Sequence, residues 1–171
     1  LEGHGLLTSS SGETKVVTKM HGLKSLPTPG YDPSRPDGEQ PGDQGPHADE
    51  PEALTRGLPD GDMPLSVIIA LMPHTMLVAE SRKSRGVWIL IELMPGDVLI
   101  WRGDLCHAGL GYSQENIRLH AYVYTLDYAA LRGRKASSVC DCHHRPPIPM
   151  LATLAPPPPL LAPEPPPPPP P

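Results

Sequence analysis

The sequence has little of what marks secreted and membrane-spanning proteins. Its 171 residues include only three cysteines, which cannot all pair with one another. Disulfide scaffolds belong to oxidising compartments. Three cysteines therefore favour a reducing compartment, and we predict a cytoplasmic protein. No apolar run approaches the roughly 20 residues that a bilayer-spanning helix needs. The first residues carry no signal-peptide pattern.

Positive charge is also scarce. The formal net charge is −5 at pH 7, and no basic stripe with interleaved aromatic residues runs through a chain that is only 4% aromatic. A surface for nucleic acid or for anionic lipid needs an excess of lysine and arginine. The sequence therefore predicts neither a nucleic acid nor a membrane as the main partner.

Proline, by contrast, is abundant and unevenly placed. Fifteen of the 26 prolines follow Arg145. Proline lacks an amide donor and favours polyproline II, so such a tract joins neither a sheet nor a helical core. We expect a flexible segment at residues 1–14, a folded domain at 15–131, and a Cys/His-rich, then Pro-rich, flexible and disordered tail at 132–171. We interpret the tail first as a linker and alternatively as a ligand for proline-binding domains.

The expected core lies between Pro64 and Tyr128, where short apolar runs are separated by turn residues. Runs rich in β-branched residues, spaced by roughly 8–12 residues, are typical of an all-β sandwich or barrel. Strands are expected at Leu65–Leu71, Thr75–Ala79, Val87–Leu93, Val98–Trp101 and Arg118–Leu126. Short helices are expected near residues 50–56 and 128–134. Before Glu50 the strand pattern is weak, apart from the stretches Thr14–Met20 and Gly22–Leu26.

Four residues with metal- and anion-binding chemistry follow one another along the chain. His47 and Asp49 form a His-x-Asp pair, and ten residues separate His107 from Arg118 further on. Two histidines and one carboxylate make the facial triad of non-haem iron(II), which leaves coordination positions open for substrates. His47, Asp49 and His107 are therefore the candidate metal ligands. A hairpin would place His107 and Arg118 on one inner face.

This order and spacing resembles the iron(II)/2-oxoglutarate-dependent oxygenases. Gly96–Ile100 and Gly103–Gly109 are similar to the strand pair that carries the distal histidine in phytanoyl-CoA-dioxygenase-like members. The resemblance spans about Leu23–Tyr128 and implies a double-stranded β-helix, a cupin-like jelly roll with minor helical elements. It also implies Fe(II) and 2-oxoglutarate as cofactors, and a dioxygenase that hydroxylates an unidentified small-molecule or protein substrate.

Two further roles follow from the resemblance. Arg118 is expected to bind the distal carboxylate of 2-oxoglutarate as a bidentate charged pair. Family members often have serine two residues after this arginine, whereas here His120 stands there and is expected to donate a second hydrogen bond. Since side chains alternate across a strand, Arg118, His120, Tyr122 and Tyr124 share one face, which suits the lining of a barrel that receives a polar cosubstrate.

A second group of metal-binding side chains lies near the tail and consists of Cys140, Cys142, His143 and His144. Structural zinc sites draw paired ligands from two separated segments, so we do not expect zinc at this cluster. Cys106 is expected to point away from the His107 side of its strand and to pack in the core.

Two alternatives stay open. One is a catalytically degenerate or truncated jelly-roll domain that binds a ligand or partner without catalysis, which the weak strand pattern before His47 favours. The other is a truncated or mispredicted gene product, since the chain begins with Leu1. If the site is active, we expect Gln44 or Tyr112 to orient the metal ligands. The prime substrate is not predicted, because its determinants lie in variable loops.

Overall fold

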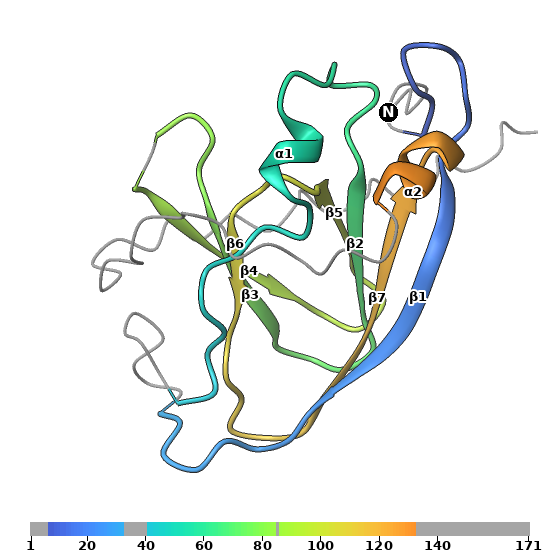
Figure 1. The fold of residues 1–171 in the computed structure, drawn as a ribbon. Helices are drawn as coiled ribbons and strands as arrows, with labels where there is room; N and C mark the ends of the chain where they lie inside the picture. Colours follow the sequence, from blue (N-terminus) through green and yellow to red (C-terminus); the bar gives the residue numbers. More distant parts are fainter. Residues whose placement is uncertain (1–6, 33–40, 85, 133–171) are drawn as a thin grey trace, which may run out of the picture.

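Two antiparallel β-sheets face each other in the computed structural model, which describes residues 7–32, 41–84 and 86–132 (Figure 1). Within these residues the larger sheet has the strand order β1-β7-β2-β5 and the smaller has the order β4-β3-β6. The elements are β1 Val16–Ser25, α1 Glu52–Thr55, β2 Leu65–Ala70, β3 Thr75–Glu80, β4 Trp88–Leu93, β5 Val98–Arg102, β6 His107–Gly109, β7 Asn116–Tyr124 and α2 Leu126–Arg132.

The chain crosses repeatedly between the sheets. From β2 in the larger sheet it passes to β3 and β4 in the smaller, back to β5, across to β6 and back to β7. This winding is the double-stranded β-helix, so the predicted all-β jelly roll is confirmed. The five strands predicted between Pro64 and Tyr128 are all present, with bounds that differ by at most two residues. Their Val, Ile, Leu and Trp content suits a pleated, half-buried surface.

Strand β1 forms over the two stretches that stood out before Glu50, residues 14–20 and 22–26. It is ten residues long and pairs antiparallel with β7, with one register shift between Val17 and Lys19. None of its side chains is fully buried. An edge strand exposed in this way shows little of the apolar alternation by which strands are recognised, so these stretches did not predict a definite strand.

Strand β6 is short and lies within Gly103–Gly109, where the resemblance implied a strand. The hairpin expected to join His107 and Arg118 is wrong, because β6 and β7 belong to different sheets. Strand β6 pairs with β3, and on its other side His107 forms an isolated antiparallel bridge with His47. In this bridge the backbone amide of each histidine donates to the carbonyl of the other at 2.9 Å. The bridge carries the His47 segment along the edge of the smaller sheet, and it fixes where the candidate site forms.

The core divides into two hydrophobic clusters. One contains Ile68, Ala70, Leu93 and Trp101, and the other contains Val78, Trp88, Cys106, Ala108 and Leu110. Cys106 is buried, as predicted.

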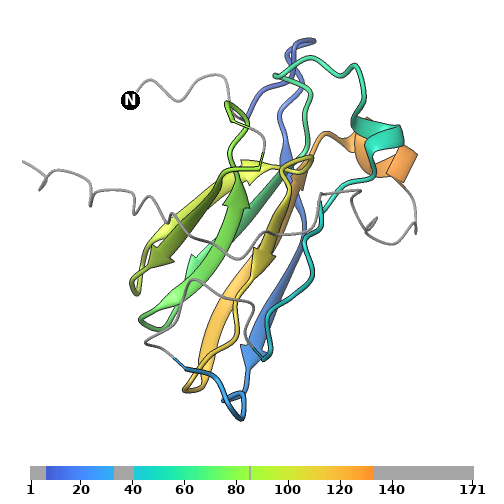
Figure 2. The same ribbon diagram turned by 90° about the vertical axis from the view of Figure 1, so that its left-hand side faces the viewer.

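The helices lie together at one end of the sandwich (Figures 1 and 2). Both were expected, although α1 has only four residues. Thr125 precedes α2, and its hydroxyl accepts a hydrogen bond from the Tyr128 amide at 3.1 Å, as helix N-caps do. Neither helix of the described ranges has the length and apolar character needed to cross a membrane. The predicted tail and the Cys140–His144 cluster lie outside the described residues.

Candidate metal centre

Three potential metal ligands converge where the His47 segment meets β6. His47, Asp49 and His107 each offer one ligand atom, and these atoms lie within 4.8 Å of one another. Only 3% of Asp49 and 5% of His107 is exposed. The two imidazole rings lie side by side, with centroids 4.5 Å apart. The fold thus brings together the three residues that the sequence analysis selected.

Backbone carbonyls orient both histidine rings. His47 Nδ1 lies 2.9 Å from the Gly45 carbonyl oxygen, and His107 Nδ1 lies 3.0 Å from that of Leu105. A carbonyl oxygen only accepts, so each Nδ1 carries the proton and each Nε2 keeps a lone pair for a metal ion. Burial lowers the pKa of His107, because removal from water disfavours the imidazolium. Its neutral form is the one that binds metals.

The acidic ligand has an oxygen that nothing in the described protein satisfies. Asp49 Oδ2 is buried without a hydrogen-bond partner and lies 3.8 Å from His107 Nε2, which is beyond hydrogen-bond length. Two donors bound at 2.0–2.2 Å to one ion lie up to about 4.0–4.4 Å apart. The 3.8 Å spacing fits a shared divalent cation, and two imidazoles with one carboxylate suit iron(II). The residues present therefore fit the metal that the resemblance implies.

Arg118 projects from β7 and is buried, with 7% of its surface exposed. Its Nη1 donates to Ser25 Oγ at 3.0 Å and to Asn116 Oδ1 at 3.3 Å, and its guanidinium lies 5.4 Å from the centre of the Tyr112 ring. All of these partners are neutral. Among the described residues, no carboxylate lies within 4.0 Å of it. A buried cation without an anionic partner is costly, so this arrangement favours an anionic ligand.

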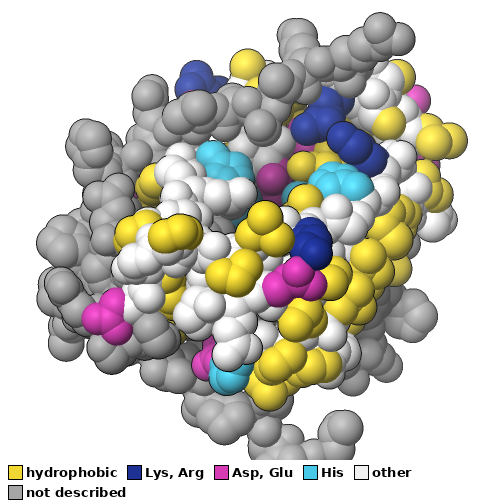
Figure 3. Space-filling model, turned by 90° about the horizontal axis from the view of Figure 1, so that it is seen from below, with side chains coloured by type: hydrophobic (Ala, Val, Ile, Leu, Met, Phe, Trp, Pro, Cys, Tyr) yellow, Lys and Arg dark blue, Asp and Glu magenta, His cyan; other side chains and the backbone are white. Residues whose placement is uncertain are grey.

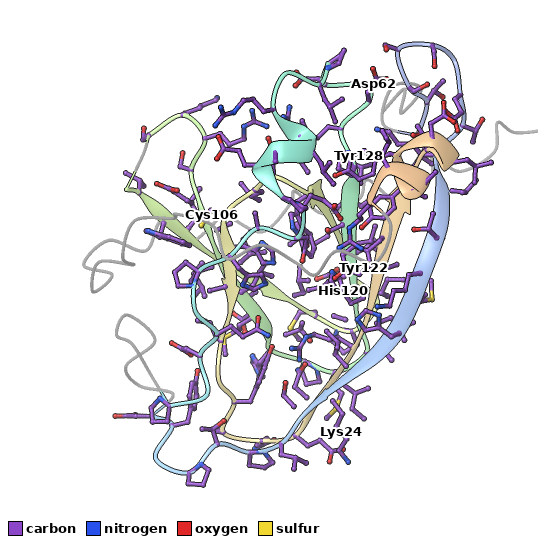
Figure 4. All side chains as sticks on the ribbon, viewed as in Figure 1. Lys24, Asp62, Cys106, His120, Tyr122 and Tyr128 are labelled. Atoms are coloured by element: carbon purple, nitrogen blue, oxygen red, sulfur yellow. The ribbon has the colours of Figure 1, made fainter. Side chains whose placement is uncertain are left out.

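His120 and Tyr122 also point from β7 into the space between the sheets (Figure 4). His120 Nε2 is buried without a hydrogen-bond partner, 3.8 Å from Asp49 Oδ2. Burial lowers the pKa of His120 to about 4 and raises that of Tyr122 to about 12. Both side chains are therefore neutral near pH 7. The role expected of His120, donation to a cosubstrate carboxylate, stays a prediction; in the structure its Nε2 lies on the Asp49 side of the cavity.

All five predicted site residues line one cavity of about 190 Å³. The other lining residues are mostly apolar and include Leu23, Ile68, Met76, Leu77 and Trp101. Seen from below, histidine side chains and a recessed acidic side chain gather around a hollow in the surface (Figure 3). A small cavity with apolar walls and a few convergent polar groups is typical of a ligand site.

A second polar cluster adjoins the cavity and was missed by the sequence analysis. Its centre is Glu50, whose side chain is fully buried. Tyr124 donates to one carboxylate oxygen, while Tyr128 and Arg132 donate to the other at 3.0 and 2.8 Å. A side chain at Gly103 would clash with Glu50, since an added Cβ would lie 2.5 Å from its Cγ. Only the β7 face pattern, which includes Tyr124, hinted at this cluster.

The two residues expected to orient the metal ligands do something else. Gln44 Oε1 accepts a hydrogen bond from the Gly109 amide at 3.1 Å. The Tyr112 hydroxyl exchanges hydrogen bonds of 3.2 Å with the Met76 backbone, and its ring supports Arg118. This expectation was wrong, because the backbone carbonyls described above already orient the rings. Asn116 was also missed, although it shares the Arg118 face of β7 and strand parity would have shown it.

Comparisons with known proteins agree with this fold. No protein-family model matches the sequence, and no curated protein matches it. Solved structures with a similar fold include a cupin domain from Bordetella pertussis, 11% identical with a TM-score of 0.37, over 66% of this chain and 94% of that one. A prolyl-4-hydroxylase from Pseudomonas putida is 16% identical with a TM-score of 0.41, over 62% of this chain and 51% of that one.

A third similar structure has a different description. It is a CENP-C domain from Drosophila melanogaster, 8% identical with a TM-score of 0.39, over 61% of this chain and 58% of that one. At these identities the likeness concerns the fold alone. The function therefore has to be argued from the site of this chain.

Proposed function

We propose that the protein is an iron(II)- and 2-oxoglutarate-dependent oxygenase that hydroxylates its substrate. The observation that carries the proposal is that one cavity holds both a group of potential metal ligands and a buried guanidinium. Asp49 and the two histidines present donors without a cation, and the buried Arg118 presents a cation without an anion. A metal ion together with a dicarboxylate satisfies both.

The three ligands have a defined task in this proposal. His47 and His107 donate through Nε2, because their Nδ1 protons are committed to backbone carbonyls. Asp49 contributes one negative charge, which leaves the bound ion with a net positive charge that attracts the keto acid. When bound, iron(II) supplies the activation of dioxygen, and three protein ligands leave it the positions that this needs.

Arg118 holds the far end of the cosubstrate in the proposal. Its hydrogen bonds to Ser25 and Asn116 and its contact with Tyr112 fix the guanidinium before the ligand arrives. Preorganisation of this kind reduces the entropy lost on binding. A guanidinium also forms the bidentate pair that a carboxylate prefers. The prime substrate is left undefined, and a jelly-roll domain that binds a dicarboxylate without catalysis is the competing outcome.

Calorimetric titration of the Mn²⁺-loaded protein tests the binding part of the proposal. We expect 2-oxoglutarate to bind more tightly than glutarate, which has both carboxylates but no keto group for chelation. The preference should vanish in metal-free protein and in His107→Ala. The exposed His74 provides the control, and His74→Ala should behave as the parent does. Equal binding of the two acids by the metal-loaded parent would contradict the proposal.

Turnover separates the oxygenase from the binding domain. Iron(II)-loaded parent protein with dioxygen and 2-oxoglutarate should release succinate slowly even without a prime substrate, and His107→Ala should not. Binding of 2-oxoglutarate with no succinate above the His107→Ala background would favour the non-catalytic alternative.

A further inference from the structure

Two buried polar atoms without partners face each other beside the metal ligands. Asp49 Oδ2 and His120 Nε2 are both buried and unsatisfied, and they lie 3.8 Å apart. More than nine-tenths of the surface of each residue is buried. A direct hydrogen bond would be shorter than 3.5 Å, and a buried polar group without a partner is costly. Something between these two atoms would satisfy both.

The spacing and chemistry favour a cation between them. His120 Nε2 is as far from Asp49 Oδ2 as His107 Nε2 is, at 3.8 Å. Both distances are below the roughly 4.0–4.4 Å that separates the most distant donors on one ion. The ring of His120 stacks on Trp101, with an interplanar angle of 6° and centroids 5.8 Å apart. Trp101 therefore supports the His120 ring from one side.

We propose that His120 is a fourth metal ligand while the cosubstrate is absent, and that the keto acid displaces it. This inference rests on the proposed metal site and adds a resting state of three histidines and one aspartate. The three donors that lie within 4.8 Å of one another do not include His120, so ligation draws its ring toward the ion.

Displacement follows from the number of coordination positions. If His47, Asp49, His107 and His120 all held the ion, a chelating keto acid and dioxygen would together need more positions than the four protein ligands would leave. His120 must therefore leave before the site is ready for dioxygen. Since Arg118 holds the far carboxylate, the incoming acid brings the binding energy that this exchange requires.

Co²⁺ binding followed by visible absorption is the first test. His120→Ser restores the serine of the family pattern, and His74→Ala removes an exposed histidine as the matched control. We expect His120→Ser to bind Co²⁺ about 10- to 100-fold more weakly, the loss typical even of groups that only support a ligand. His74→Ala should match the parent. Parent that binds no Co²⁺ would overturn the proposed function together with this inference, whereas equal affinities in parent and His120→Ser would overturn the inference alone.

The affinity of His120→Ala for 2-oxoglutarate distinguishes displacement of His120 from its first expected role as a hydrogen-bond donor to the cosubstrate. At saturating Co²⁺, displacement predicts that 2-oxoglutarate binds more tightly to His120→Ala than to the parent, because no ligand has to leave. A His120 that donates to the cosubstrate predicts weaker binding in the same variant, and that result would overturn the inference.

The parent protein alone provides a measurement that needs no variant. In a sample labelled with ¹³C-histidine and loaded with Co²⁺, ligated rings give strongly shifted NMR signals. We expect three shifted histidines without cosubstrate and two after saturation with 2-oxoglutarate. Two shifted histidines in both samples would overturn the inference while leaving the proposed metal site intact.

Discussion

Asp49 and Glu50 are neighbours in the sequence and are both buried carboxylates, yet their hydrogen-bonding surroundings differ. Glu50 is surrounded by the hydroxyls of Tyr124 and Tyr128 and by the guanidinium of Arg132. Asp49 has an oxygen with no partner, and the side chains nearest to it are neutral imidazoles. The Glu50 carboxylate therefore has hydrogen-bond donors at both oxygens, whereas one oxygen of Asp49 has none among the described residues.

The same contrast runs along the inner face of β7. At its C-terminal end, Tyr124 completes the Glu50 cluster and ties the strand to α2. Toward its N-terminal end, and counting only the described residues, Arg118 has neutral partners only and His120 has an unsatisfied nitrogen. Folding is expected to favour satisfied buried polar groups throughout. Among the described residues, Asp49, Trp101 and His120 each combine an unsatisfied buried atom with a place in the cavity lining, which is where we expect a ligand to bind.

The largest effect expected from this contrast is on folding stability. Glu50→Ala leaves Arg132 and two phenols without their acceptor, and it should lower the free energy of unfolding by about 3–5 kcal/mol, as removal of one member of a buried ion pair does. Asp49→Asn removes an uncompensated buried charge, so the metal-free variant should be at least as stable as the parent. Urea denaturation without metal measures both. If metal-free Asp49→Asn lost as much stability as Glu50→Ala, the proposed difference between the two carboxylates would be contradicted.

A smaller effect is expected at the anion end of the cavity. Arg118→Ala should weaken 2-oxoglutarate binding by roughly 1.5–3 kcal/mol, the range for a hydrogen bond to a charged group, while metal affinity stays unchanged. Arg118→Lys should recover only part, because an ammonium cannot form the bidentate pair. Calorimetry of the metal-loaded variants measures this. Unchanged affinity in Arg118→Ala would place the dicarboxylate elsewhere.

Acid should destabilise the metal-free protein through the buried histidines. Burial lowers the pKa of His120 from 6.5 to about 4, and it also lowers that of His107. As the pH falls below about 6.5, the unfolded chain takes up these protons first, so stability decreases from about pH 6.5 toward pH 4. One proton accounts for at most about 1.4 kcal/mol per pH unit. Urea midpoints at pH 7, 6 and 5 measure this loss of stability. In His120→Gln the midpoint should depend less on pH, and an equal dependence in that variant would exclude His120 as the cause.

The smallest effect is expected at the proline-rich tail. Deletion of residues 145–171 removes few side chains able to fill a core, so the free energy of unfolding should change by less than about 0.5 kcal/mol. As a linker, the tail should also bind SH3- or WW-type domains no better than a scrambled proline-rich control does. A melting temperature many degrees lower after deletion would show that the tail packs on the domain.

Sequence reasoning reached the jelly roll and the five cavity residues because both depend on local patterns. Alternation along β7 set Arg118 and His120 on one inner face, and a His-x-Asp pair with a later histidine is a compact signal. What it missed depends on tertiary contacts. Strand β1 is exposed at a sheet edge and has no fully buried side chain, and the Glu50 cluster joins residues up to 82 positions apart in the chain. No spacing rule predicts such a cluster.

Metal titration tests the central claim most directly. Parent protein, His107→Ala and the surface control His74→Ala are titrated with Mn²⁺, as a stand-in for iron(II), under identical conditions. The account predicts one ion per chain for the parent and for His74→Ala, and no specific binding for His107→Ala. Equal stoichiometry and affinity in His107→Ala and the parent would contradict it, because the ion would then be bound away from His47, Asp49 and His107.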